Sequence, residues 1–146
     1  MSLLTLLDLS AAFNTVDHTI LLRQLQTTYD LEQDVLLWFK SYLTGRTQSV
    51  RCAESTSAIL SVKFGLPQGS GLRPILFLLY MAEFVHLIES FPLRPHVFAD
   101  DTQIYGSRHP SATGDLQHHV VLCIMAVAGR MMSNRLQLNT AKTEVM

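Results

Sequence analysis

The sequence lacks the features that mark membrane-spanning, secreted or free-standing nucleic-acid-binding proteins. Its uninterrupted apolar runs, such as residues 75–82, are far shorter than the ~18 residues that a membrane span needs. The apolar start, residues 2–8, contains no basic residue and ends in an acid, which excludes a signal peptide. The net charge is −1, so there is no basic excess of the kind that an autonomous nucleic-acid binder carries.

Cysteine is also scarce, whereas apolar residues are plentiful. Cys52 and Cys123 lie far apart and form no metal-binding spacing, so we expect two buried, reduced thiols. This predicts an intracellular location, nuclear or cytoplasmic, without membrane attachment. Hydrophobic residues make up 48% of the 146 residues, which is enough for one core and excludes disorder. Nothing in the sequence indicates an obligate protein partner.

The first third of the chain predicts a strand followed by two helices. Residues 2–8 form a short apolar run suited to a buried strand. Asp17 can cap a helix that continues to about Tyr29. Asp30 and Gln33 resemble a capping box for a second helix. The apolar side predicted for that helix consists of Leu31, Val35, Trp38, Phe39 and Tyr42.

The remaining chain alternates strand and helix patterns. It predicts, in order, a hairpin of residues 48–53 and 58–64, a loop over 65–70, an apolar helix over 74–89, two strands over 96–99 and 102–105, a helix over 112–133, and further strand structure around Leu136, Leu138, Val145 and Met146. Interleaved elements of this kind indicate an α/β or α+β fold.

Three acids form the first candidate site. Asp100 and Asp101 lie between two β-prone segments, where a tight turn would let both reach one place. Adjacent carboxylates repel unless a cation joins them, and Mg²⁺ prefers oxygen ligands. Asp8 ends the first apolar strand, and if that strand lies beside the turn the three carboxylates converge. The alternative is a solvated acidic turn, since aspartate is common in turns.

Two further features have both a functional and an ordinary interpretation. The loop over residues 65–70 has glycines that allow close backbone approach, and helix N-termini favour phosphate. It also fits an ordinary connection between a strand and a helix. Lys142, near the chain end, by itself reads as a surface lysine.

Five segments, in order, resemble one known family. They are Leu-Asp-Leu-Ser-Ala-Ala-Phe at residues 7–13, Trp-Phe-Lys-Ser-Tyr-Leu at 38–43, Gly-Leu-Pro-Gln-Gly-Ser at 65–70, Phe-Ala-Asp-Asp-Thr-Gln at 98–103 and Asn-Arg-Leu-Gln-Leu-Asn at 134–139. Together they resemble the reverse transcriptase domain of non-LTR (LINE-type) retrotransposons. The resemblance covers almost the whole chain, and the order and spacing of the segments make it specific.

The resemblance implies a right-hand polymerase palm, in which helices pack on a small antiparallel sheet. Residues 1–146 would be a partial reverse transcriptase domain: the palm with an adjoining part of the fingers, without the amino-terminal fingers and the thumb. The implied activity is RNA-directed DNA synthesis, in which dNTPs are added to the 3′-hydroxyl of a DNA primer on an RNA template. We expect the chain to be inactive alone.

The resemblance also implies roles for individual residues. Asp8, Asp100 and Asp101 would be the metal ligands of a two-metal nucleotidyl transfer that uses Mg²⁺ or Mn²⁺. Lys142 falls where a catalytic lysine can protonate the leaving pyrophosphate.

The substrate-binding residues implied by the resemblance are Phe13, Gln68 and Gly69. Phe13 takes the place of the aromatic steric gate that excludes a ribose 2′-hydroxyl, although its residue type alone suggests a core position. Gln68 would contact the incoming nucleotide or the template, next to Gly69.

Three residues depart from the family pattern. Asn14 stands where aspartate is usual, Arg73 where glycine is usual, and Arg130 in place of a packing tryptophan. These departures suggest a decaying copy, so one alternative is a fragment retained only as a non-catalytic folded or binding domain. A second alternative is the palm of an RNA-dependent RNA polymerase, against which Phe13 argues.

Overall fold

The computed structural model describes residues 2–139 and 141–146. In chain order the elements are β1 (Ser2–Leu7), α1 (Ala12–Thr15), α2 (His18–Thr27), α3 (Gln33–Leu43), β2 (Thr47–Gln48), β3 (Arg51–Cys52), β4 (Ser55–Thr56), β5 (Leu60–Ser61), α4 (Leu72–Glu89), β6 (Arg94–Phe98), β7 (Asp101–Ser107), the short 3₁₀ turn η1 (Pro110–Ala112), α5 (Thr113–Ser133) and β8 (Glu144–Val145). This mixture of helices and antiparallel strands confirms the predicted fold class.

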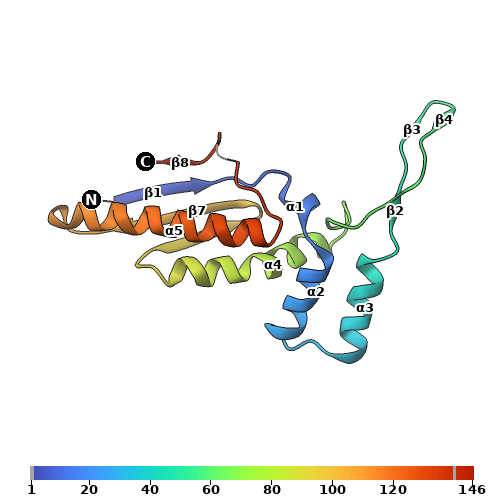
Figure 1. Ribbon diagram of the computed structural model, residues 1–146, viewed down its shortest axis with the longest axis horizontal. Coiled ribbons are helices and arrows are strands. Elements are labelled where there is room, and N and C mark those ends of the chain that lie inside the picture. The colour runs from blue at the N-terminus through green and yellow to red at the C-terminus, as the bar shows by residue number, and fades with distance from the viewer. Residues whose placement is uncertain (1, 140) are drawn as a thin grey trace.

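A four-stranded antiparallel sheet, in the order β6-β7-β1-β8, is the centre of the fold. Side chains alternate along its strands, so that Leu3, Thr5 and Leu7 of β1 are buried while Leu4 and Leu6 are partly exposed. Helices α4 and α5 cover the buried face and leave the other face of the sheet without a helix (Figure 1). The sheet therefore has one packed face and one open face.

Helices α4 and α5 supply 11 of the 23 apolar residues that are buried in the described part of the chain. The buried residues of α5 recur every three or four positions, as a helix with one apolar face requires; they are Leu116, Val120, Cys123, Val127 and Met131. Those of α4 are Leu76, Phe77, Tyr80, Met81, Phe84 and Ile88. Burial raises the pKa of the Cys123 thiol to about 11.

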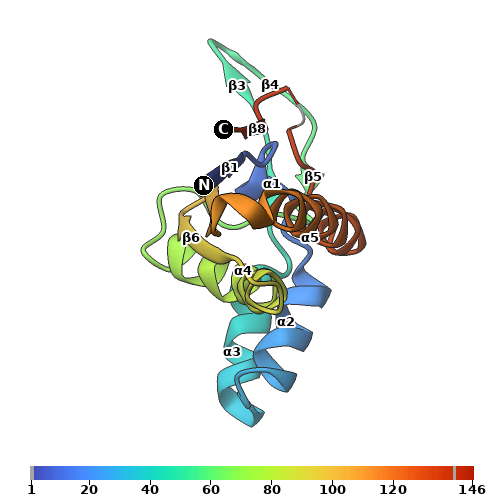
Figure 2. The ribbon, with the colours of Figure 1, turned by 90° about the vertical axis from the view of Figure 1, so that its left-hand side faces the viewer.

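Helices α2 and α3 and the hairpin of β2–β5 extend away from the sheet (Figures 1 and 2). Asp17 caps α2 as predicted, because its Oδ1 accepts hydrogen bonds from the backbone N–H groups of Thr19 at 2.8 Å and Ile20 at 3.2 Å. The hairpin is also confirmed, with β2 paired to β5 and β3 paired to β4. Every residue from 47 to 61 is exposed, so the hairpin adds nothing to the core.

The prediction for α3 was wrong in two respects. Its N-cap is Glu32, without a side-chain capping bond, and Asp30 has φ 55°, so the pair of Asp30 and Gln33 forms no capping box. The predicted apolar side is also displaced, since Val35 is 49% and Trp38 52% exposed. The predicted residues Leu31, Phe39 and Tyr42 do pack against the core, and Leu36 and Leu43 join them in place of Val35 and Trp38. Among the other helices α3 packs mainly against α2, so only one narrow face is covered.

Two further sequence predictions require correction. Cys52 is exposed on β3, not buried, because the hairpin projects into solvent; both cysteines are free thiols. Asp101 is the first residue of β7 and not part of a turn, and the two turn residues are Ala99 and Asp100. In the part of the chain that the structure describes, no helix is both long enough and apolar enough to cross a membrane.

Candidate active site

The two central strands bring Asp8 and Asp101 to the same place on the open face of the sheet. The last paired positions of β1 and β7 are Leu7 and Thr102, so that Asp8 and Asp101 follow opposite each other. Leu7 and Thr102 are each 2% exposed and face the helices. Because neighbouring strand residues point to opposite faces, the two aspartates point away from the helices.

A small open cavity of about 240 Å³ lies between these two acids. It is lined by Leu6, Leu7, Asp8, Asp101, Thr102, Gln103 and Lys142. The structure therefore unites three of the predicted catalytic residues, Asp8, Asp101 and Lys142, although the two acids are 93 positions apart in the chain.

Asp8 is held by the segment that follows α5. The Nδ2 group of Asn139 donates a hydrogen bond to Asp8 Oδ2 at 2.9 Å, and the Asn139 backbone N–H donates to the Asp8 carbonyl at 2.9 Å. Lys142 Nζ lies 3.9 Å from the same Oδ2, and the Lys142 side chain is 70% exposed. An exposed ion pair of this length contributes little to stability, so Lys142 is free to contact a ligand. Sequence reasoning assigned no role to Asn139.

Asp100 does not line this cavity. It occupies the second position of the turn between β6 and β7, after Ala99, which has φ 55°. Within residues 2–139 and 141–146, no three His, Cys, Asp or Glu side chains are grouped closely enough to hold a metal ion. Of the three predicted acids, Asp8 and Asp101 thus line the cavity, whereas Asp100 lies on the adjacent turn. The two neighbouring acids are separated because Asp100 belongs to the turn and Asp101 to strand β7.

Phe13 is half-buried and packed between two side chains of α4. Its ring centroid lies 4.4 Å from that of Phe77, and the Arg73 guanidinium carbon lies 4.6 Å from the Phe13 centroid. Arg73 Nε is buried and has no hydrogen-bond partner among the described residues. The arginine that replaces the usual glycine therefore rests on the candidate gate residue. Arg130, in contrast, is exposed in the last turn of α5.

The loop that contains Gln68 and Gly69 is hydrogen-bonded to α1 and to the residue that follows it. Backbone N–H groups of Gly65 and Leu66 donate to the carbonyls of Val16 at 2.8 Å and Phe13 at 2.9 Å. A Cβ atom on Gly65 would lie 2.9 Å from the Asn14 backbone, so this close approach requires glycine. Gln68 and Gly69 are exposed, and Gln68 shares a cavity of about 540 Å³ with Asn14, away from the acids.

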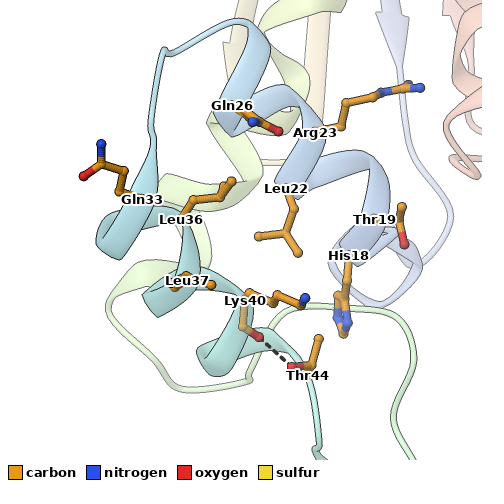
Figure 3. Close-up of a pocket in the computed structure, with 10 residues that line it drawn as sticks. All are labelled: His18, Thr19, Leu22, Arg23, Gln26, Gln33, Leu36, Leu37, Lys40 and Thr44. Atoms are coloured by element: carbon orange, nitrogen blue, oxygen red, sulfur yellow. Dashed lines mark hydrogen bonds between the residues drawn. The ribbon is translucent and has the colours of Figure 1, made fainter.

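Another cavity contains none of the predicted site residues. It measures about 660 Å³ and lies between α2 and α3, with Leu22, Leu36 and Leu37 as its apolar lining (Figure 3). Polar and basic side chains, including Arg23 and Lys40, complete it.

Comparisons with known proteins identify the family and the fold. A profile of the family "Reverse transcriptase (RNA-dependent DNA polymerase)" matches residues 2–146. A probable RNA-directed DNA polymerase from the transposon X-element of Drosophila melanogaster is 37% identical over 115 residues; the match covers 74% of this chain and 12% of that protein. The chain thus spans about an eighth of the relative's length.

Solved telomerase structures share the fold. The telomerase of Candida albicans, in complex with a fragment of telomeric RNA, matches 99% of this chain with a TM-score of 0.74 at 12% identity, over 27% of its own length. The apo telomerase of Candida tropicalis, truncated from its C-terminal domain, matches 99% of this chain with a TM-score of 0.73 at 14% identity, over 30% of its length. These structures support an α+β polymerase palm. With the profile and the transposon relative, they show that the chain belongs to the reverse transcriptase family, in the non-LTR retrotransposon type that its motifs predicted.

Proposed function

We propose that the chain supplies the catalytic palm of an RNA-directed DNA polymerase. This enzyme adds dNTPs to the 3′-hydroxyl of a DNA primer on an RNA template, at an intracellular site, nuclear or cytoplasmic. The observation that carries the proposal is the meeting of Asp8 and Asp101 at one cavity on the open face of the sheet, in a chain of the reverse transcriptase family. Residues 1–146 form part of the domain, and the rest of the enzyme supplies the remaining contacts.

The donor set at the cavity fits a hard divalent cation. Asp8 and Asp101 present only oxygen ligands, and Mg²⁺ commonly binds one or two carboxylates together with substrate phosphates. Mg²⁺ or Mn²⁺ bound there would neutralise charge on the triphosphate and lower the pKa of the primer hydroxyl. Asp8 and Asp101 would hold the ion, and Asp100 would contribute from the adjacent turn.

Asn139 and Lys142 act on the two sides of Asp8. Asn139 fixes the orientation of the carboxylate through its 2.9 Å hydrogen bond, so it is a positioning residue. Lys142 is close enough to the cavity to reach a phosphate that occupies it, and its three N–H donors bind phosphate oxygens. Lys142 then gives its proton to the departing pyrophosphate.

Phe13, Gln68 and Gly69 select and orient the substrates. The ring of Phe13, held between Phe77 and Arg73, provides a rigid surface that excludes a 2′-hydroxyl. Gln68 is exposed and offers an amide to the nucleotide or the template. Gly69 has φ 77°, and a Cβ atom added to it would meet no other atom within 4 Å, so this position leaves room for close approach.

The test is a chimaeric enzyme in which the chain replaces the matching segment of the X-element relative. We expect RNA-templated incorporation of dNTPs. Asp8→Asn and Asp101→Asn should each reduce incorporation by more than about 100-fold, since even residues that only support a metal ligand can cost that much. Asp115→Asn, at an exposed position on α5, should leave the rate unchanged.

The chimaera also separates the alternatives. Equal use of dNTPs and rNTPs would favour an RNA-dependent RNA polymerase. A folded chimaera without activity, even after Asn14→Asp, Arg73→Gly and Arg130→Trp, would favour a non-catalytic domain and overturn the proposal.

A further inference from the structure

Three cavities on the side of α2, α3 and the hairpin base join into one groove, here called the basic groove. The cavity between α2 and α3 shares His18, Thr19 and Thr44 with a second cavity of about 340 Å³. The second cavity shares Arg46, Thr47, Ser61, Val62 and Lys63 with the third, of about 540 Å³, which reaches Gln68. The groove is therefore extended, and it is separate from the cavity of Asp8 and Asp101.

The charge along the basic groove has one sign. Arg23 and Lys40 line its first cavity, and Arg46 and Lys63 line the other two. Figure 3 shows Lys40 of α3 extending toward His18 at the start of α2. None of the described residues that line these three cavities is an aspartate or a glutamate. In a chain whose net charge is −1, four of the eleven Lys and Arg residues are thus concentrated in one channel.

The other lining groups suit a nucleic-acid strand. At the third cavity the ring of Phe64 is 41% exposed, and the amides of Asn14, Gln48 and Gln68 lie around the same space. Proteins that bind single strands combine a positive groove along the phosphates with aromatic rings on which bases stack. An acidic peptide would satisfy the cations but would make no use of the exposed part of the ring or of the amides.

We propose that the basic groove binds a single RNA strand, with Arg46 and Lys63 against its phosphates and Phe64 beneath a base. The inference rests on the proposed function in one point, which is that the bound strand is the template of the polymerase. It extends that function by assigning a strand path along α2, α3 and the hairpin base. The Arg46 side chain is already oriented at the groove, because its guanidinium donates a hydrogen bond to the Gly65 carbonyl at 3.3 Å.

The experiment uses the 146-residue chain and a short fluorescent single-stranded RNA, with anisotropy measured over a range of salt concentrations in EDTA. Arg46→Gln combined with Lys63→Gln should raise Kd at least about tenfold, because two charge-assisted contacts are lost. The slope of log K against log salt should fall by about 1.4, at about 0.7 for each phosphate contact. Lys63→Gln alone, at an exposed side chain, gives the same effect at half the size even if the Arg46 variant folds poorly.

Arg94→Gln combined with Arg130→Gln is the matched control, since it removes the same charge at exposed positions outside the groove. An equal loss of affinity in this control would overturn the proposal, because binding would then depend only on net charge. Competition by poly-glutamate as strong as that by unlabelled RNA would indicate an acidic polypeptide instead. EDTA keeps metal out of the measurement, so a failure here is distinct from a failure of the Asp8 and Asp101 site.

Discussion

At the scale of single residues, Tyr80 shows how burial controls a titration. The side chain is fully buried on α4, and its hydroxyl donates a hydrogen bond to the Asn134 carbonyl at 2.6 Å. Burial raises the pKa of Tyr80 from 10 to about 12. The neutral hydroxyl therefore ties the end of α5 to α4 over the whole neutral and mildly alkaline range.

We predict that this contribution to stability disappears between pH 10 and about 12. In that interval the unfolded tyrosine has lost its proton and the folded one has kept it, so the free energy of unfolding falls as pH rises, by on the order of 2 kcal/mol. Urea denaturation at several pH values measures the slope. Tyr80→Phe should have a smaller slope, and Tyr105→Phe, at a residue that is 45% exposed, should behave like the parent chain. Equal slopes for Tyr80→Phe and the parent would contradict the assignment.

The sequence singled out Asp8, Asp100 and Asp101 because acids next to apolar strands are chemically unusual, and the family resemblance gave them a role. It did not predict that Asn139 holds Asp8, because the two residues are 131 positions apart and no local pattern links them. It placed Cys52 in the core for a similar reason, since short apolar stretches occur both in buried strands and in exposed hairpins. Such contacts depend on the whole topology, which residue patterns do not determine.

At the scale of elements, one carboxylate connects the start of α2 to the segment after α5. While Oδ1 of Asp17 caps α2, its Oδ2 lies 2.8 Å from Arg135 Nε. Arg135 also lies over the Phe64 ring, at 5.1 Å from its centroid. The Arg135 side chain is 62% exposed, so solvent weakens the ion pair, and the cap is the larger contribution.

Asp17→Asn and Asp17→Ala should therefore differ in stability. Asparagine retains an oxygen for the cap and loses only the ion pair, so we expect a loss below about 1 kcal/mol. Alanine also removes the cap, which costs about 1 kcal/mol more. Urea denaturation of both variants, with Arg135→Gln as the measure of the ion pair together with the Phe64 contact, tests the division. A larger loss from Arg135→Gln than from Asp17→Ala would show that the ion pair dominates.

The helices were largely predictable because their apolar spacing is regular, as in α5. The orientation of α3 was not, because its sequence is apolar on several sides, as Val35, Trp38 and Phe39 illustrate. Only the packing partner decides which side is buried, and here α2 covers a narrow face. Trp38 instead stacks on Tyr42, with ring centroids 5.6 Å apart, while remaining half exposed.

At the scale of the whole molecule, the cavity of Asp8 and Asp101 and the basic groove occupy different places, with no lining residue in common. The chain spans 12% of the length of the X-element relative. Nucleotidyl transfer requires the primer end, the template base and the triphosphate to be held together, and this positioning supplies much of the rate. With a net charge of −1, the chain has little general attraction for a duplex.

We therefore predict that the purified 146-residue chain binds a primer–template weakly and with strong salt dependence, and incorporates no dNTPs. Extension of a labelled primer on an RNA template, with Mg²⁺ and separately with Mn²⁺, is the measurement. The chimaera with the X-element relative serves as the positive control. Template-dependent extension by the isolated chain would show that these residues alone position all three substrates.

The two thiols differ in exposure, and the exposed one, Cys52, allows a spectroscopic probe to be attached to the hairpin alone. Only the thiolate form of cysteine reacts readily, and Cys123 is buried with a pKa of about 11, whereas Cys52 is exposed on β3. A maleimide dye added near neutral pH should consequently modify Cys52 and spare the core. The fluorophore would stand on the same hairpin whose base borders the basic groove. Energy transfer to a dye on a bound oligonucleotide could then follow the path of the strand, with no cysteine added or removed.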